Sequence, residues 1–182
     1  MRLLETGTMV LSFRKWFARP ATCPDNLATA ETNAVGMEAQ FLTGLKFEGG
    51  KGVDQDYAKA AHWYAQAAEQ NHSLAQLNLA ILYGQGQGVA RDEAKSLMWL
   101  SRAAKLGNAT AQYRLGVHEH LTSRKGLVGA VTESRIEALK WVRLSAAQGY
   151  QPAESACEFL ALGMSREEVA ASALRVGEFV AG

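Results

Sequence analysis

The chain has 182 residues, of which 48% are apolar and 20% are charged, and its formal net charge is +1. This composition predicts a folded, soluble protein, and the near-neutral charge gives no reason to expect nucleic acid or another strongly charged partner. No apolar run reaches about 18 residues, so no transmembrane helix is predicted, while abundant alanine and only three prolines favour helices.

The first segment with a pattern is MVLSFRKWFARP, residues 9–20, which is basic and places four apolar side chains on one helical face: Val10, Phe13, Trp16 and Phe17. Its basic residues follow the apolar ones, whereas a secretory signal carries its charges first, so no signal peptide is predicted. A cytoplasmic location is therefore expected, while a periplasmic location and a start at either Met1 or Met9 stay open. The segment either packs on the first helix of the body, is disordered, or lies on a membrane surface.

Two prolines and the lack of a hydrophobic period predict a linker over residues 18–30. The expected organisation has three parts. Residues 1–32 form the basic segment and linker, residues 33–153 form three repeats, and residues 154–182 form capping helices.

An internal repeat dominates the rest of the chain. A shift of 36 residues aligns Trp63 with Trp99, and a shift of 42 residues aligns Trp99 with Trp141. The same shifts align many alanines and glycines. Repetition at this period is typical of stacked supersecondary units.

Each unit reads as a helix, a glycine-rich loop and a second helix. Three residues are predicted to begin the second helix as N-caps, namely Asp56, Asp92 and Ser134, and Glu137 would complete a capping box with Ser134. Gly107 and Gly149 stand where the second helix is expected to end. Three valines are expected to close the open end of each hairpin: Val53, Val89 and Val131.

The loop YGQGQGV, residues 83–89, is predicted to turn the chain and not to bind phosphate. A phosphate-binding loop follows a strand and ends in Lys and Ser or Thr, whereas this loop follows a helix and continues as ARD.

These positions resemble Sel1-like repeats, a branch of the tetratricopeptide-type α-solenoids. The second repeat carries the family pattern at Ala75, Leu79, Tyr83, Gly88, Val89, Asp92, Trp99, Ala103, Ala104, Gly107 and Ala111. The first repeat departs from it with Thr43 for the leucine and Asn71 for the late glycine. The resemblance implies an all-α, right-handed α/α solenoid of three helical hairpins. A C-terminal helical cap, with a capping box at Ser165 and Glu168, would close it.

No catalytic residue, cofactor or metal site is predicted. His118 and His120 are one residue apart, so on a helix they point about 200° apart and cannot share a metal. Cys23 and Cys157 are expected to be free thiols, with Cys157 in the core. Glu154 is expected to lie with Glu158 on a solvated face.

The resemblance implies a non-enzymatic scaffold or adaptor that binds another protein on the concave surface. Apolar positions repeat along the first helices at Phe41, Leu45, Leu77, Ile81, Tyr113 and Val117, and they either line the groove or pack between helices. In the second case the groove surface would consist of their polar neighbours: Gln76, Asn78, Gln112 and Arg114. A second candidate is the insertion LTSRKGLVGAVT, residues 121–132, which is read as a loop carrying Arg124 and Lys125.

Two other functions stay open. A cysteine-rich branch of the family has been linked to β-lactam binding, which suggests a β-lactam or cell-wall hydrolase, but its paired cysteines are missing here. Residues 9–19 suggest a membrane-surface adaptor. The sequence does not identify the partner protein or the oligomeric state.

Overall fold

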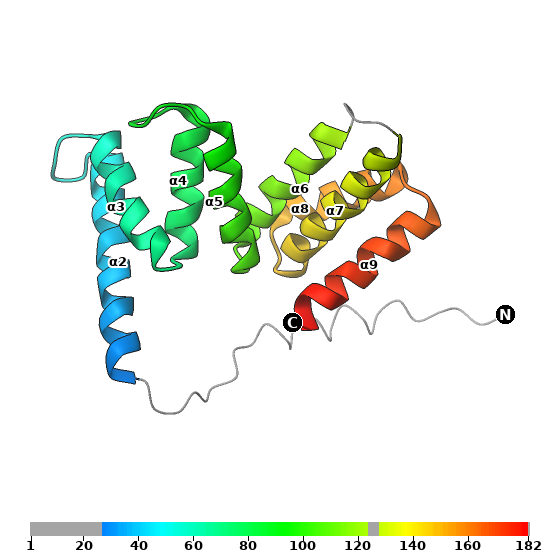
Figure 1. Ribbon diagram of the computed structural model, residues 1–182, viewed down its shortest axis with the longest axis horizontal. Helices are drawn as coiled ribbons and strands as arrows, with labels where there is room; N and C mark the ends of the chain where they lie inside the picture. Colours follow the sequence, from blue (N-terminus) through cyan, green and yellow to red (C-terminus); the bar gives the residue numbers. More distant parts are fainter. Residues whose placement is uncertain (1–26, 124–127, 182) are drawn as a thin grey trace. The chain divides into compact units, whose positions relative to one another are not determined.

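The computed structural model describes residues 27–123 and 128–181, and every described element is an α-helix (Figure 1). The helices are packed as sequential hairpins, which confirms the predicted all-α fold. In chain order they are α2 (Leu27–Gly49), α3 (Tyr57–Glu69), α4 (Ser73–Gln85), α5 (Glu93–Lys105), α6 (Ala109–Ser123), α7 (Val128–Ala147), α8 (Gln151–Leu162) and α9 (Arg166–Ala181). They form two units that divide within α6, between Leu115 and Gly116.

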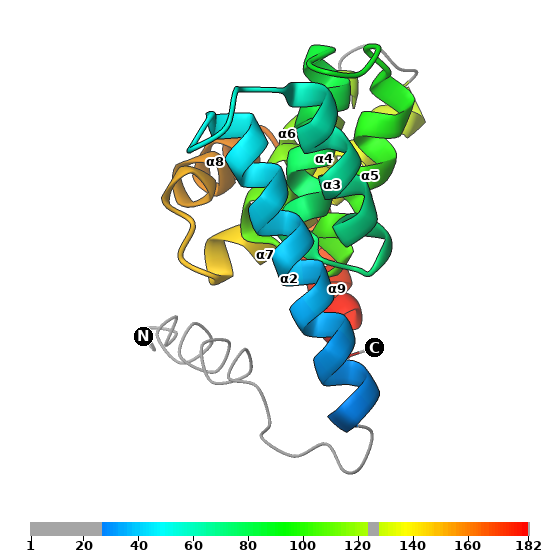
Figure 2. The same ribbon diagram turned by 90° about the vertical axis from the view of Figure 1, so that its left-hand side faces the viewer.

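In the first unit α2 packs against α3, α3 against α4, and α4 against α5. The first turns of α2 extend beyond the other helices of this unit (Figure 2). This helix begins at Leu27, so residues 27–30 of the predicted linker are helical.

The second helices of the first two hairpins begin as predicted. The Asp56 carboxylate accepts hydrogen bonds from the backbone N–H groups of Ala58 and Lys59, both at 3.0 Å, and Asp92 accepts one from Lys95 at 3.0 Å. These bonds satisfy N–H groups that have no partner within the helix.

The predicted helix ends are also confirmed. Gly107 and Gly149 adopt left-handed backbone conformations, with φ of 83° and 81°. The first hairpin has Asn71 at this position with φ of 65°, and no other non-glycine residue in the described ranges has a positive φ. Asparagine tolerates this conformation better than most residues, which explains why it replaces glycine here.

The glycine-rich loops turn the chain. In the second hairpin the N–H of Asp92 donates to the carbonyl of Tyr83 at 3.0 Å, which closes the loop, and Gly88 has φ of 69°. A Cβ added to Gly88 would lie 2.2 Å from the carbonyl carbon of Tyr57, so this loop lies directly against the start of α3. The corresponding Gly52 has φ of 75° but no described atom within 4 Å of an added Cβ. Of these two loops, the second therefore lies against a neighbouring hairpin and the first does not.

The predicted closing role of the valines is not supported at Val53, whose side chain is exposed. Its loop has no described neighbour at Gly52 to pack against.

Within a hairpin, a small residue on the first helix faces a larger one on the second. A Cβ added to Gly44 would lie 2.5 Å from the ring of Tyr64, and one added to Gly116 would lie 2.6 Å from a methyl group of Val142. The corresponding residues of the second hairpin are Ala80 and Leu100, both buried. The size of the residue on the first helix and that of its counterpart on the second helix therefore differ from one hairpin to the next.

The described cores consist mainly of alanine and leucine. Five small residues are completely buried, which lets neighbouring helices approach closely: Ala67, Ala68, Ala103, Ala104 and Ser145. Trp99 and Trp141 are buried as well, whereas Trp63 is only partly buried.

In the second unit α7 packs against α8 and α9. The Trp141 ring meets the Phe179 ring of α9 edge to face, with centroids 5.2 Å apart. The capping box before α9 is confirmed: Ser165 N–H donates to Glu168 at 2.7 Å, and Glu168 N–H donates to Ser165 Oγ at 3.2 Å.

Two predictions for the third repeat were wrong. Helix α7 begins at Val128, so Ser134 lies inside the helix and is not its N-cap. Helix α6 ends at Ser123, so the predicted loop over 121–132 is helical at both ends. The inserted residues therefore mostly lengthen the two helices.

Candidate functional site

The structure places two of the predicted ladder residues in the core. Phe41 is buried, and its ring stacks on the His72 ring at a centroid distance of 4.5 Å and lies 5.8 Å from the Tyr64 ring. Leu77 is buried as well. Both side chains therefore pack between helices, where little of their surface can reach a partner.

The other ladder positions keep some accessible surface. Leu45 is exposed on α2, and Ile81 and Tyr113 are partly exposed. Arg114 is exposed on α6, and Val117, which is partly exposed, belongs to the second unit.

Two of the polar neighbours are not groove surface. Gln76 and Gln112 are buried, and their side-chain amides donate to the carbonyl oxygens of Ala68 and Ala104 at 2.9 and 3.0 Å. Each bond ties a first helix to the second helix of the preceding hairpin. Such a bond satisfies carbonyl groups near a helix end that have no partner within the helix.

The remaining residues singled out from the sequence fall into two groups, those outside the described residues and those at the surface or partly buried. Arg124, Lys125, Cys23 and residues 9–19 lie outside the described residues. Cys157 is partly buried, and burial is the main cause that raises the pKa of its thiol to about 11. Glu154 and Glu158 are both exposed, as predicted.

A search of the described ranges finds no group of three or more His, Cys, Asp or Glu residues placed to hold a metal ion. It also finds no helix that is long and apolar enough to cross a membrane.

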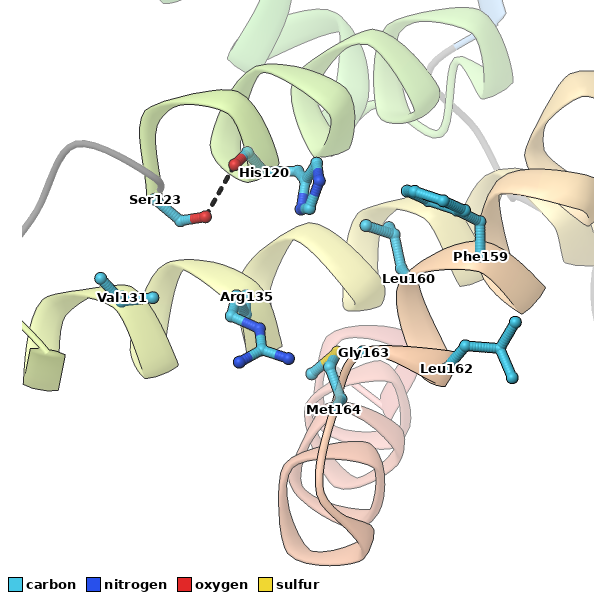
Figure 3. Close-up of a pocket in the computed structure, with 9 residues that line it drawn as sticks. All are labelled: His120, Ser123, Val131, Arg135, Phe159, Leu160, Leu162, Gly163 and Met164. Carbon is cyan, nitrogen blue, oxygen red and sulfur yellow. Dashed lines mark hydrogen bonds between the residues drawn. The ribbon is translucent and has the colours of Figure 1, made fainter.

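The described part of the second unit contains a pocket of about 610 Å³ (Figure 3). The end of α6 and the first half of α7 form one side, and the end of α8 with the turn before α9 forms the other. It is lined by His120, Ser123, Val131, Arg135, Phe159, Leu160, Leu162, Gly163 and Met164.

The rim of the pocket is apolar and unusually accessible. The side chain of Phe159 is 70% exposed and that of Leu162 is 87% exposed. They stand three residues apart on α8, so they lie near one helical face. The ring of Phe159 meets the imidazole of His120 edge to face, with centroids 6.4 Å apart.

The hydroxyl of Ser123, on the α6 side of the pocket, is bound to the backbone of its own helix. The hydroxyl of Ser123 donates to the backbone carbonyl of His120 at 2.7 Å (Figure 3). This bond holds the hydroxyl against its own helix and not against a base, whereas a serine nucleophile is activated by a base within hydrogen-bond distance.

Arg135 is the cation that lines the pocket. Its Nη1 lies 3.6 Å from the Glu168 carboxylate, and the other oxygen of that carboxylate accepts the hydrogen bond of the capping box. Among the described residues Arg135 donates no hydrogen bond.

Two other arginines of this unit make short hydrogen bonds or ion pairs. Arg143 donates to the carbonyl of Val169 and the hydroxyl of Ser172, and Arg175 pairs with Glu133 and Glu137 at 2.6 and 2.7 Å. Arg135 differs from both because its contact with Glu168, at 3.6 Å, is longer than a hydrogen bond.

Sequence reasoning missed this pocket. The segment EFLALG was interpreted only as part of a cap, although Phe159 and Leu162 have the spacing of one helical face. Their exposure could not be inferred, because it depends on which face α8 turns toward α7. Val131 was assigned to hairpin closure and instead lines the pocket.

A known family of repeat proteins matches the chain repeat by repeat. The family model for the Sel1 repeat matches residues 38–72, 73–108 and 109–150. No curated protein matches the chain.

Two solved structures are similar. A Sel1 repeat protein from Oxalobacter formigenes is 29% identical with a TM-score of 0.59, and the match covers 72% of this chain and 51% of that one. A protective antigen of uropathogenic Escherichia coli strains, described as displaying an SLR fold, is 22% identical with a TM-score of 0.47, covering 91% of this chain and 45% of that one. The chain spans about half the length of each.

Proposed function

Because the chain belongs to the Sel1 repeat family, we propose that it is a non-enzymatic scaffold or adaptor that binds a segment of another protein. The observation that carries the proposal is the pocket of the second unit with its exposed rim, Phe159 and Leu162. The binding surface proposed here is therefore this pocket, in place of the ladder of first-helix residues.

Energetics favour a binding role for the rim. Burial of apolar surface contributes about 25 cal/mol per Å², and side chains this exposed contribute little of it to the fold. Large exposed apolar side chains around a concave site are typical of interaction surfaces, and a few aromatic anchors usually supply most of the binding energy.

The pocket is also suited to recognition because regular elements hold it. Its lining residues come mainly from three packed helices, and Leu160 is buried at its base. A preformed site loses less conformational entropy when it binds than a mobile loop does.

A peptide-display selection on the full chain tests the proposal. The wild type is compared with the double variant Phe159→Ala/Leu162→Ser, and Leu174→Ser serves as a matched control. Leu174 is 70% exposed, as Phe159 is, but does not line the pocket.

We expect the selected peptides to bind the double variant at least about tenfold more weakly, which corresponds to about 1.4 kcal/mol. Binding to the control variant should not change. Selected peptides that bind all three proteins equally would contradict a role for the pocket.

A further inference from the structure

We propose that the pocket of the second unit binds an acidic amphipathic peptide, whose carboxylate side chain pairs with Arg135 while its apolar face covers Phe159 and Leu162. This inference rests on the proposed function and adds the chemistry of the partner. This site combines two strongly exposed apolar side chains with an arginine that can accept a second carboxylate (Figure 3).

The charge argument begins with the donors of Arg135. A charge-assisted N–H···O bond is about 2.7–2.9 Å long, so the ion pair with Glu168, at 3.6 Å, leaves guanidinium donors of Arg135 for a second acceptor. The other oxygen of the Glu168 carboxylate accepts the hydrogen bond of the capping box. A guanidinium presents five donors in a planar fork, so a second carboxylate can bind it in a bidentate manner while Glu168 stays in place.

The position of Arg135 strengthens such a contact. Its side chain is 27% exposed, which places it between a solvated surface and a buried core. Charges in this position are less screened by salt than exposed ones are. No carboxylate belongs to the pocket lining, whereas Glu158 and Glu167 are exposed outside it and are screened more strongly.

The rim argues for a polypeptide and against a small carboxylate. Phe159 and Leu162 line the pocket, but with 70% and 87% of their surface exposed they offer more apolar surface than a small carboxylate bound at Arg135 would cover. An amphipathic helix that carries several apolar residues along one face can cover both rim residues and also reach Arg135. A peptide with an apolar face and an acidic residue beside it therefore matches both the exposed apolar rim and Arg135.

The basic segment of the chain itself is a poorer occupant. Residues 9–19 carry an apolar face, but their ionisable groups are Arg14, Lys15 and Arg19. Cations placed near a half-buried arginine repel it, so this segment lacks the charge that the pocket favours.

The test uses three display libraries that share randomised apolar positions and differ only in their fixed polar positions. These positions are Glu in one library, Gln in the second and Lys in the third. Each library is selected against the full chain, and binding of the enriched peptides is then measured against Arg135→Gln and Arg135→Lys. Thermal melting of both variants establishes that they remain folded.

We expect enrichment from the Glu library, with affinity at least about tenfold higher than that of the same peptides carrying Gln. Arg135→Gln should remove this difference between Glu and Gln peptides, and Arg135→Lys should restore part of it. Simple loss of stability does not produce this pattern, because it weakens both peptides alike.

The remaining outcomes distinguish failure of the acidic-partner proposal from failure of the proposed scaffold function. Pocket-dependent peptides from the Gln or Lys library would leave the scaffold function standing and overturn the acidic partner. The proposal of an acidic peptide partner would also be overturned if a synthetic peptide of residues 9–19 displaced the selected peptides. Displacement by the small carboxylate decanoate would overturn it as well. If no library and no random peptide gives binding that depends on Phe159 and Leu162, the proposed function fails as well.

Discussion

Gly52 and Gly88 show how one residue type serves two purposes in equivalent loops. Both have a positive φ, but only Gly88 lies against the backbone of the preceding hairpin, at Tyr57 and Ala58. Conformation alone requires a glycine at the first position, and both conformation and space require one at the second.

We predict that Gly88→Ala destabilises the protein much more than Gly52→Ala. A left-handed alanine costs about 1–2 kcal/mol at either position. At Gly88 the new Cβ must also displace backbone atoms that lie 2.2–2.4 Å away. Urea unfolding of both variants measures the difference, and equal midpoints would contradict a direct contact between the loop and α3.

The tryptophans give a second prediction at this scale. Trp99→Ala should cost about 3–5 kcal/mol, the usual range for a buried aromatic residue, and should cause cooperative loss of helix. Arg102 also loses the indole face over which its guanidinium lies at 4.9 Å. Trp63→Ala is the matched control. Trp63 is only partly buried, so its replacement should lower the free energy of unfolding by less. Melting followed by circular dichroism checks this, and a wild-type melting temperature for Trp99→Ala would contradict it.

Most single-residue features were predictable because their causes are local. Asp56 and Asp92 cap helices through groups two or three residues away, and Asn71 takes a backbone conformation that its own side chain tolerates. Ser134 has the same local pattern but lies inside α7, because the residues before it continue the helix back to Val128. A capping residue at that position then competes with helix propagation, and in this case the helix extends past it.

At the level of elements, the contact between α7 and α9 depends on charge. Burial acts to raise the pKa of Glu137, but hydrogen bonds from Lys140 and Arg175 outweigh it, so the pKa lies below its ordinary value of 4.5. A carboxylate with a lowered folded-state pKa stabilises the fold above its unfolded pKa. This contribution is lost as the pH falls through the folded value.

We therefore predict that the melting temperature falls between about pH 5 and pH 3, partly through this group. Glu137→Gln should lower the melting temperature at neutral pH and should reduce the fall in acid. The exposed Glu158→Gln is the control and should change neither. Parallel pH profiles for wild type and Glu137→Gln would show that the pair with Arg175 contributes nothing.

The pocket belongs to the level of elements as well, which explains why sequence reasoning did not find it. Its lining is brought together by the angle at which α8 leaves the turn at Gly149 and by the length of α7. Neither quantity follows from hydrophobic period, since Phe159 fits a buried and an exposed face equally well. The ladder was ambiguous for the same reason, and burial placed Phe41 and Leu77 in the core.

For the whole molecule, the repeats and the cap were predictable, while the pocket of the second unit was not. Repetition at fixed spacing specifies stacking, because one hairpin cannot bury its own apolar face. The cap follows from the same need, since α9 covers Trp141 through Phe179 and supplies Arg175 to two carboxylates of α7.

We predict that a chain ending at Ser165, which lacks α9, exposes the apolar face of α7. Dye binding by 1-anilinonaphthalene-8-sulfonate should rise and the melting temperature should fall, because end repeats need a polar cover. Leu174→Ser in the full chain alters an exposed residue of the same helix and should behave as wild type. A truncated chain with unchanged melting and dye binding would contradict a capping role for α9.

The matched sizes inside each hairpin also affect how such an array can evolve. A crossover inside a hairpin that joined the first helix of repeat two to the second helix of repeat one would set Ala80 against Tyr64. The added Cβ would then lie about where one at Gly44 would, 2.5 Å from that ring. The reciprocal product would face Gly44 with Leu100 and leave a void. Unequal recombination should therefore exchange whole hairpins, so that copies are gained or lost as intact units.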